Sequence, residues 1–173
     1  RKQEVNNLNV YPVPDGDTGT DLSLTVKSIL EDLQAAPSSL DAAGVCSHVE
    51  EAALMGARGN SGVILSQMVR GAMEALGEVG ELTPPVLAAT LRRATETAYR
   101  AVRKPVEGTM LTVLREMAEA AEAAPVTADL EEMLRLVAEA GWESVRRTPQ
   151  LLRALADAGV VDAGGFGMVV LLE

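Results

Sequence analysis

Aromatic residues are scarce in this sequence, making up 2% of its 173 positions, whereas hydrophobic residues of all kinds make up 47%. A core without large rings has to be built from Ala, Leu, Val and Met side chains. Such a core favours closely packed helices over a β-sandwich, whose strands are rich in aromatic and β-branched residues. The length is enough to bury a core and is most simply that of one domain, residues 1–173.

Cysteine and positive charge are also scarce. The single cysteine, Cys46, excludes an internal disulfide framework and favours a reducing compartment, so we expect a cytoplasmic protein. Lys and Arg number 15 against 25 Asp and Glu, and the resulting net charge of -10 argues against nucleic acid as a partner. No apolar run approaches the length of a membrane span, and no signal-peptide pattern is present, so we expect no transmembrane segment.

Helix signals recur along the whole sequence. Apolar residues at the spacing of one helix face predict helices over residues 22–33, 40–55, 63–72, 84–102, 110–117, 128–137 and 149–158. Two Thr-Pro pairs, at Thr83 and Thr148, are typical of a cap followed by the first helical residue. No segment has the alternation of a strand. The sequence therefore predicts an all-α fold, an antiparallel bundle or barrel of about eight amphipathic helices.

The most informative part of the sequence is the acidic segment, residues 9–21, which reads Asn-Val-Tyr-Pro-Val-Pro-Asp-Gly-Asp-Thr-Gly-Thr-Asp. Asp15 and Asp17 flank a glycine, and Asp21 follows one helical turn later. Its two prolines exclude a regular helix or interior strand upstream, and apolar positions at helical spacing begin at Leu22. Carboxylates there suit a hard cation such as Mg²⁺, and free helix N–H groups suit an anion. The segment therefore predicts a metal–phosphate site.

Other interpretations of the acidic segment fit less well. An EF-hand loop beginning at Asp15 would need glycine and glutamate where Thr20 and Val26 stand. A strand-borne Asp-x-Asp would follow a buried β run, and Tyr-Pro-Val-Pro is a poor strand. A simple helix cap needs one carboxylate. Two acids one residue apart, held among prolines and glycines, exceed that need and favour the metal site.

Four connections hold the unusual residues: the acidic segment and residues 56–62, 104–109 and 161–165. Two predicted helices separate each of the first three connections from the next, and alternate connections of an antiparallel bundle lie at the same end. Three predicted helices precede residues 161–165, and we expect this connection to join the other three in a composite site. Each alone has a simpler interpretation, since Ser61 and Thr109 could be ordinary caps and Asp162 an ordinary turn residue. Taken as ligand groups, residues 59–62 could cradle phosphate with backbone N–H groups.

Residues 7–20 and 56–67 strongly resemble the N-terminal ATP-binding domain of bacterial fatty acid kinase. That domain belongs with the nucleotide-binding subunit of the dihydroxyacetone kinases. The turns at residues 108–110 and 162–164 match in the same order, so the resemblance covers nearly the whole sequence. It implies a barrel of about eight antiparallel helices. The sequence begins at Arg1 and ends within an apolar run, and we expect it to be part of a longer polypeptide.

The resemblance also implies roles for individual residues. Asp15 and Asp17 would be catalytic and would hold two Mg²⁺ ions that bridge the ATP phosphates. Asn9 and Asp21 are the alternatives for a third metal ligand. The residues implied at the phosphates are Gly59, Asn60, Ser61 and Gly62, and Thr18 and Gly19 are expected as further nucleotide-binding residues. The residues implied around the nucleoside are Thr109, Met110, Asp162, Ala163 and Gly164.

The function that this resemblance implies is transfer of the ATP γ-phosphate to a fatty acid carboxylate presented by a lipid-binding carrier protein. A carboxylate is already ionised at neutral pH, so positioning and charge neutralisation would suffice without a general base. Two alternatives are phosphorylation of dihydroxyacetone or a similar small ketone, and a nucleotide-sensing module without catalysis. We expect Mg²⁺ and ATP or ADP as ligands. A homodimer, and a peripheral membrane link through the carrier, are further expectations.

Overall fold

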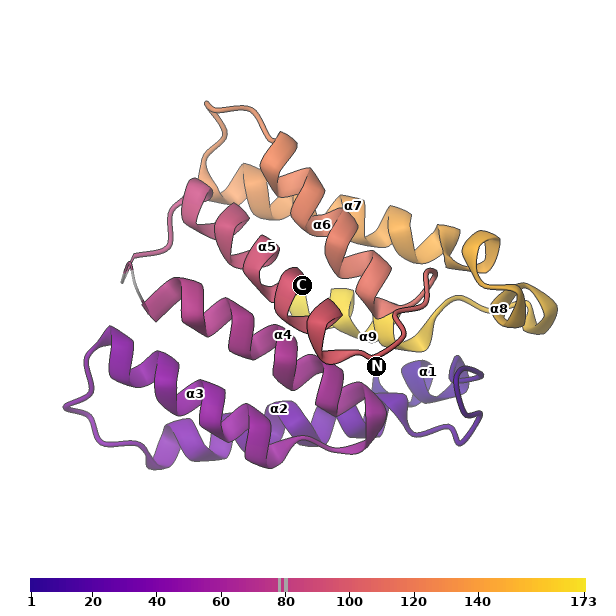
Figure 1. Cartoon of the computed structure of the whole chain (residues 1–173), viewed down its shortest axis with the longest axis horizontal. Coiled ribbons are helices and arrows are strands. Elements are labelled where there is room, and N and C mark those ends of the chain that lie inside the picture. Colours follow the sequence, from indigo (N-terminus) through magenta and orange to yellow (C-terminus); the bar gives the residue numbers. More distant parts are fainter. Residues whose placement is uncertain (78, 80) are drawn as a thin grey trace.

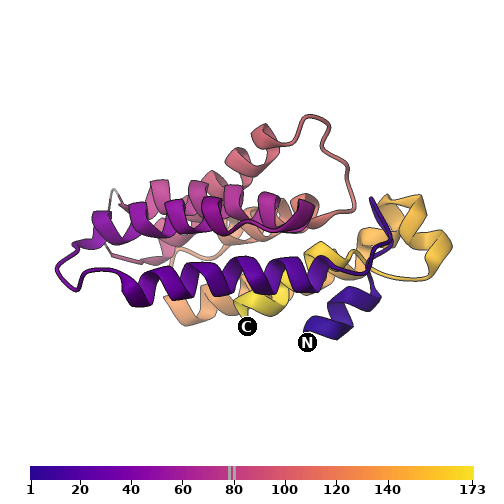
Figure 2. The same ribbon diagram turned by 90° about the horizontal axis from the view of Figure 1, so that it is seen from below.

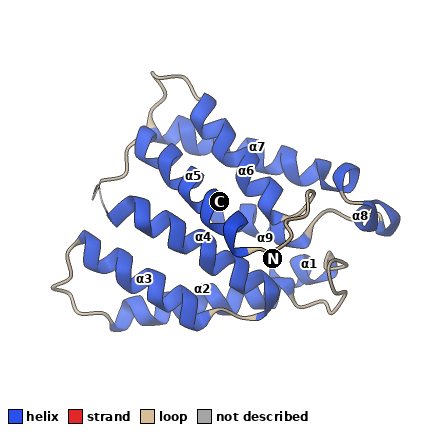
Figure 3. Cartoon of the chain, in the orientation of Figure 1, coloured by secondary structure: helices blue, strands red, loops and turns tan. Residues whose placement is uncertain are grey.

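The computed structural model describes residues 1–77, 79 and 81–173 and is helical, with no strand in these residues (Figure 3). The expected all-α fold is thereby confirmed. Its helices are α1 (Lys2–Asn7), α2 (Thr18–Ala35), α3 (Ala42–Gly56), α4 (Gly59–Gly77), α5 (Pro84–Ala101), α6 (Met110–Ala123), α7 (Leu130–Leu151), α8 (Arg153–Ala158) and α9 (Ala163–Leu172).

The long helices form an antiparallel barrel. Each of α2 to α7 packs against the next one in the chain, and α9 lies against α2, α6 and α7, so that it closes the ring. Figure 1 shows α3 to α6 in chain order across one face, and Figure 2 shows α2 and α9 in a second layer beneath them. The short helix α1 packs on α2 and α9 at the end of the barrel where α2 begins.

The core is made of aliphatic and methionine side chains, as the composition predicts. Met117, Val113 and Val169 are fully buried, and they bring α6 and α9 together at its centre. Not every residue on a predicted apolar face is inside: Leu30 is 53% exposed and Leu134 is 42% exposed. Within the described ranges, no helix has the length and apolar character needed to cross a membrane.

One predicted helix start was wrong. Thr148 and Pro149 do not open a helix, because α7 continues through Pro149 to Leu151. A proline inside a helix leaves the carbonyl four residues earlier without its N–H partner. Here the Thr148 hydroxyl donates to that carbonyl, on Val145, at 2.7 Å. The hydroxyl replaces the missing donor, so the helix continues for another turn.

Two helices were not predicted. Helix α1 is six residues long and has only one buried residue, Val5, so its sequence carries no periodic signal. Helix α9 is apolar on all sides, because it lies between other helices, and therefore also lacks an amphipathic pattern. Residues 163–165, expected in a turn, form its first turn. The segment at 56–62 is likewise mostly helical, since α4 begins at Gly59.

Candidate functional site

The four connections meet at one end of the barrel, which confirms their expected convergence. They line two adjoining cavities. The larger, of about 230 Å³, is lined by Tyr11, Pro12, Thr18, Asn60, Ser61, Ile64, Val102, Lys104, Val106, Thr109, Met110, Leu111, Asp162 and Gly164. The smaller, of about 120 Å³, is lined by Asn9, Tyr11, Pro12, Val13, Asp15, Asp17, Thr18, Asp21, Gly59, Asn60 and Ser61. Because five residues line both, the acidic end and the apolar end form one composite site.

The acidic segment is held in place from α1. The buried side chain of Asn9 donates a hydrogen bond from its amide nitrogen to Oδ1 of Asp15 at 2.7 Å. The backbone N–H of Asn9 donates to the carbonyl of Asn6, which is in α1. The amide nitrogen of Asn9 is therefore occupied by Asp15. A ligand role for Asn9 could use only its amide oxygen and stays a prediction.

Three carboxylates line the smaller cavity with no cation beside them. In the described part of the chain, none of Asp15, Asp17 and Asp21 has a Lys or Arg within ion-pair distance. Desolvation and the hydrogen bond and charge of Asp15 raise the pKa of Asp17. Desolvation and the charges of Asp17 and Asp15 raise the pKa of Asp21. Such uncompensated negative charge suits a bound cation.

The small number of carboxylates at this site suits a Mg²⁺ ion that is also bound by a phosphate. Among the residues described, no three His, Cys, Asp or Glu side chains gather closely enough to hold a metal ion by themselves. Mg²⁺ at phosphoryl-transfer sites is usually held by one or two carboxylates, with substrate phosphates and water completing its shell. Asp15 and Asp17 could supply those carboxylates, with Asp21 behind them.

The N-terminus of α4 faces the same cavity. Gly59, its first residue, has a positive φ of 55°, and a Cβ there would overlap the carboxylate of Asp21. Thr25 braces the preceding turn, since its hydroxyl donates to the Asp21 carbonyl at 2.8 Å and accepts from the Arg58 N–H at 3.1 Å. Free N–H groups at a helix N-terminus suit phosphate oxygens, and Asn60 and Ser61 line both cavities.

A network of polar side chains holds the turn at residues 104–109. Glu107 accepts hydrogen bonds from Thr112 at 2.7 Å and from Arg115 at 2.8 Å. Although desolvation opposes it, these bonds lower the pKa of Glu107, so this carboxylate is a stable anion. Gly108, with a φ of 83°, donates its N–H to the Thr112 hydroxyl. The network fixes the wall of the larger cavity that carries Lys104.

Asp162 lies between two helix N-termini. It is buried, and its carboxylate accepts from the Gly165 N–H at 2.7 Å as the cap of α9. The N–H of Met110, at the start of α6, also bonds to it. Burial raises the pKa of Asp162 from 3.8 to about 6, although both N–H groups favour the charged form. The Asp162 N–H donates to the Thr148 hydroxyl at 3.0 Å, which ties this turn to α7.

The raised pKa of Asp162 predicts a pH-dependent stability. Because the folded pKa exceeds the unfolded one, Asp162 favours folding most below pH 4, and this contribution is lost as the pH rises through 6. Asn at this position keeps the capping oxygen but cannot ionise. In urea titrations from pH 4 to 8, the stability of Asp162→Asn relative to the native protein should rise by up to about 3 kcal/mol. A difference that stays flat across this range would contradict the prediction.

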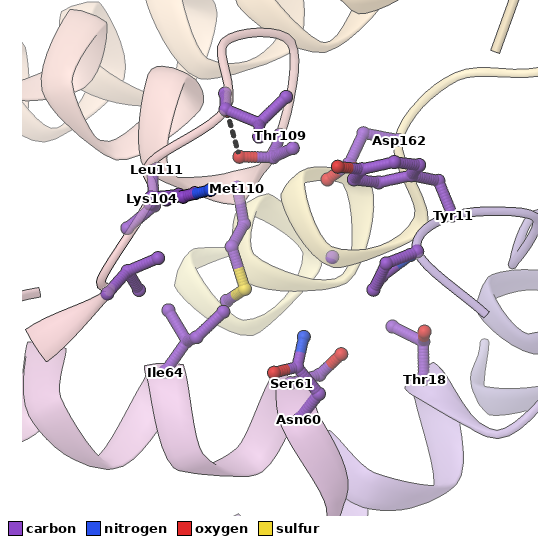
Figure 4. A pocket seen from close by; sticks show the side chains of 14 residues that line it. Tyr11, Thr18, Asn60, Ser61, Ile64, Lys104, Thr109, Met110, Leu111 and Asp162 are labelled. Atoms are coloured by element: carbon purple, nitrogen blue, oxygen red, sulfur yellow. Dashed lines mark hydrogen bonds between the residues drawn. The ribbon is translucent and has the colours of Figure 1, made fainter. Parts of the chain in front are cut away.

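Figure 4 shows how the larger cavity is arranged. Met110 reaches from α6 towards Ile64 and Ser61 on α4, with Asp162 on one side and Lys104 on the other. The Thr109 hydroxyl donates to the Val106 carbonyl at 2.8 Å, so it braces its own turn. One face of the cavity is therefore apolar, as a flat heterocycle would need, and the opposite end is polar.

Three predicted residues line neither cavity. A Cβ at Gly19 would overlap α1, and one at Gly62 would overlap Thr25, so both glycines allow close helix packing. Ala163 is buried in the first turn of α9. The nucleotide-binding roles of all the predicted residues stay predictions.

Sequence reasoning missed seven residues that line the larger cavity: Tyr11, Pro12, Ile64, Val102, Lys104, Val106 and Leu111. Four of them lie within connections that had already been singled out. The others lie in or next to α4, α5 and α6, where apolar periodicity cannot distinguish a core residue from a cavity residue.

The fold and this site define an all-α barrel with an acidic pocket at one end. A model of the DAK2 domain matches residues 12–173, so the chain belongs to the DAK2 domain family.

The chain is 45% identical over 170 residues to uncharacterized proteins of Staphylococcus aureus strains USA300 and NCTC 8325. The match covers 98% of this chain and 31% of each relative, so the chain spans about a third of their length. Among solved structures, it superposes on the dihydroxyacetone kinase of C. freundii in complex with AMP-PNP and Mg²⁺. That match has a TM-score of 0.69 and 20% identity and covers 99% of this chain and 29% of the kinase, which shows a common fold.

Proposed function

We propose that this chain is an ATP- and Mg²⁺-dependent kinase module. The observation that carries the proposal is the meeting of three uncompensated carboxylates, the α4 N-terminus and an apolar pocket at one end of the barrel. Triphosphate, metal and nucleobase need these three environments side by side. The C. freundii kinase, which shares this fold over 29% of its chain, was solved with AMP-PNP and Mg²⁺, and this supports the assignment.

Each part of the site has a task in this proposal. Mg²⁺ held by Asp15 and Asp17 would neutralise the charge that builds up on the phosphates. Backbone N–H groups at Asn60 and Ser61 bind phosphate oxygens, and Met110 packs against the base. The acceptor oxygen attacks the γ-phosphorus, the bond from that phosphorus to the β,γ-bridging oxygen breaks, and ADP leaves.

The nucleotide should bind in a metal-dependent way. Because the chain carries a net charge of -10 and its cavity holds free carboxylates, phosphates would be repelled without cations. Calorimetry with ADP should show an affinity at least about tenfold higher in Mg²⁺ than in EDTA, or ~1.4 kcal/mol. Equal affinity in the two buffers would contradict the metal site.

We propose a fatty acid carboxylate, carried by a lipid-binding protein, as the acceptor. The support is the Val-Tyr-Pro-Val-Pro form of residues 10–14, which resembles the fatty acid kinases more than the ketone kinases. A carboxylate needs no base, and His48, the single histidine, contacts the Asp32 carbonyl and lines neither cavity. The product would be an acyl phosphate, with no proton to be removed.

The acceptor can be tested with the full-length protein. Given ATP, Mg²⁺ and a fatty acid on its carrier, it should consume ATP and yield an acyl phosphate that hydroxylamine traps. Dihydroxyacetone should support no turnover above the rate without acceptor. Turnover with dihydroxyacetone, and none with any carrier-bound acyl chain, would contradict the fatty acid as acceptor. The assignment as a kinase would remain.

A further inference from the structure

The N-cap of α2 differs from the other aspartate caps in the chain. Asp41, Asp129 and Asp162 each accept a hydrogen bond from the backbone N–H three residues later, at 2.7 to 2.8 Å. This is the usual way in which an aspartate caps a helix. Asp17, the N-cap of α2, makes no side-chain capping bond. Its carboxylate is therefore not used to begin the helix.

Asn6, in α1, has taken over that capping bond. The N–H of Thr20, three residues after Asp17, donates to Oδ1 of Asn6 at 3.0 Å. The amide nitrogen of Asn6 donates in turn to the Thr20 hydroxyl at 3.0 Å. Both ends of one side-chain amide thus bind one residue in the first turn of α2. An orphan N–H of that turn is satisfied from another helix, 14 residues away.

The backbone conformation of Asp17 is consistent with capping by Asn6. The capping residues Asp41 and Asp129 have extended backbones, with ψ of 176° and 177°. Asp17 has a ψ of -7°, which is the helical region and not the conformation usual for a cap. Its carboxylate lines the smaller cavity beside that of Asp15.

Close packing keeps Asn6 in place. A Cβ at Gly19 would overlap the Lys2 carbonyl and come within 2.9 Å of Val5, so α1 lies directly on the first turn of α2. The adjacent Asn9 donates to Asp15 at 2.7 Å. The Asn6 amide, from α1, thus acts on the α2 N-terminus through Thr20, and the Asn9 amide, just after α1, bonds directly to Asp15.

We infer that Asn6 is a positioning residue that caps α2 in place of Asp17 and so leaves the Asp17 carboxylate available for the metal ion. This inference rests on the proposed function, because it assumes that Asp15 and Asp17 hold Mg²⁺. Without Asn6, the Thr20 N–H loses its acceptor, and we expect Asp17 to adopt the extended backbone of Asp41 and cap the helix in the usual way. Metal binding then has to break a capping bond that the native protein never makes.

The test is the Mg²⁺-dependent gain in ADP affinity, measured by calorimetry with Mg²⁺ and with EDTA. Asn6→Ala should reduce this gain about fivefold, equivalent to ~1 kcal/mol, the usual strength of an N-cap bond. Its ADP affinity in EDTA should be unchanged. Thr20→Val is the matched control: it removes the hydroxyl bond to Asn6 but keeps the N–H, and it should keep the native gain within about twofold.

NMR gives a second readout that does not depend on activity. Hydrogen-bond couplings should join the Thr20 N–H to the side chain of residue 6 in the native protein and to Asp17 in Asn6→Ala. If Asn6→Ala does not fold, Asn6→Asp tests the capping role of residue 6 instead, because it keeps an acceptor there. That variant should show the residue-6 coupling and a gain within about twofold of the native value, allowing for one hydrogen bond of altered strength.

The outcomes separate the two proposals. If native protein gains no ADP affinity from Mg²⁺, the proposed function fails. If the native protein shows the gain and folded Asn6→Ala keeps it in full, only the role of Asn6 is overturned. A native Thr20 N–H coupled to Asp17 would also overturn that role.

Discussion

Asp15→Ala and Asp17→Ala should each lower phosphoryl transfer by at least about a hundredfold while leaving the helical fold intact. Both side chains line the smaller cavity, and Asp17, although it is the N-cap residue of α2, makes no side-chain capping bond. Their removal takes away ligands for the cation that offsets the phosphate charge. Turnover of the full-length protein and far-UV circular dichroism, measured on the same samples, test both parts of this expectation.

Asp129→Ala is the matched control for these two variants. Asp129 is also an aspartate at a helix N-terminus, but its carboxylate accepts the Glu132 N–H at 2.8 Å. Its loss should cost about 1 kcal/mol of stability and leave turnover unchanged. If Asp15→Ala or Asp17→Ala instead behaves as Asp129→Ala does, that residue has a structural role and is not part of the metal site.

Gly59→Ala should weaken nucleotide binding by at least tenfold, equivalent to ~1.4 kcal/mol. The added Cβ would overlap the Asp21 carboxylate, and neither group can move freely, because Asp21 is in a buried helical turn. The overlap should shift the α4 N-terminus away from the carboxylates. Calorimetry with Mg²⁺ and ADP measures the loss directly.

Gly159→Ala separates this overlap from backbone strain. Gly159 also has a positive φ, 68° against 55° at Gly59, but a Cβ there meets nothing within 4 Å. Both variants should lose about 1 kcal/mol of stability because alanine resists this backbone conformation, and Gly59→Ala should lose more because of the overlap. Only Gly59→Ala should lose nucleotide affinity. Equal nucleotide affinities in the two variants would show that the α4 N-terminus does not bind the phosphates.

Much of the fold could be predicted from the sequence because its signals are local. The spacing of Leu87, Leu91 and Ala94 defines one face of α5, and Thr83 with the following proline defines its start. Such signals depend on residues within two turns of each other. Pro149 shows the limit of this reasoning: a proline that usually begins a helix lies inside α7, because the hydroxyl of Thr148 replaces its missing donor.

The site was predictable in part for a different reason. Asp15 and Asp17 stand out because two carboxylates one residue apart, among prolines and glycines, have no role in packing. The helix count between connections then indicated that Thr109 would lie nearby. Asp162 joins it because the chain between them forms two long helices, α6 and α7, followed by the six-residue α8. Ile64 and Val102 could not be distinguished, because an apolar residue facing a cavity has the same local pattern as one facing the core.

By itself the sequence determined the all-α class, the start of most long helices and the acidic segment, since each depends on neighbours along the chain. Only the tertiary structure decided which groups those segments contact. The capping of α2 by Asn6 and the position of Asp162 between two helix N-termini both join different helices. Such bonds form only after the barrel has brought the helices together, because no spacing in the sequence specifies a partner on another element.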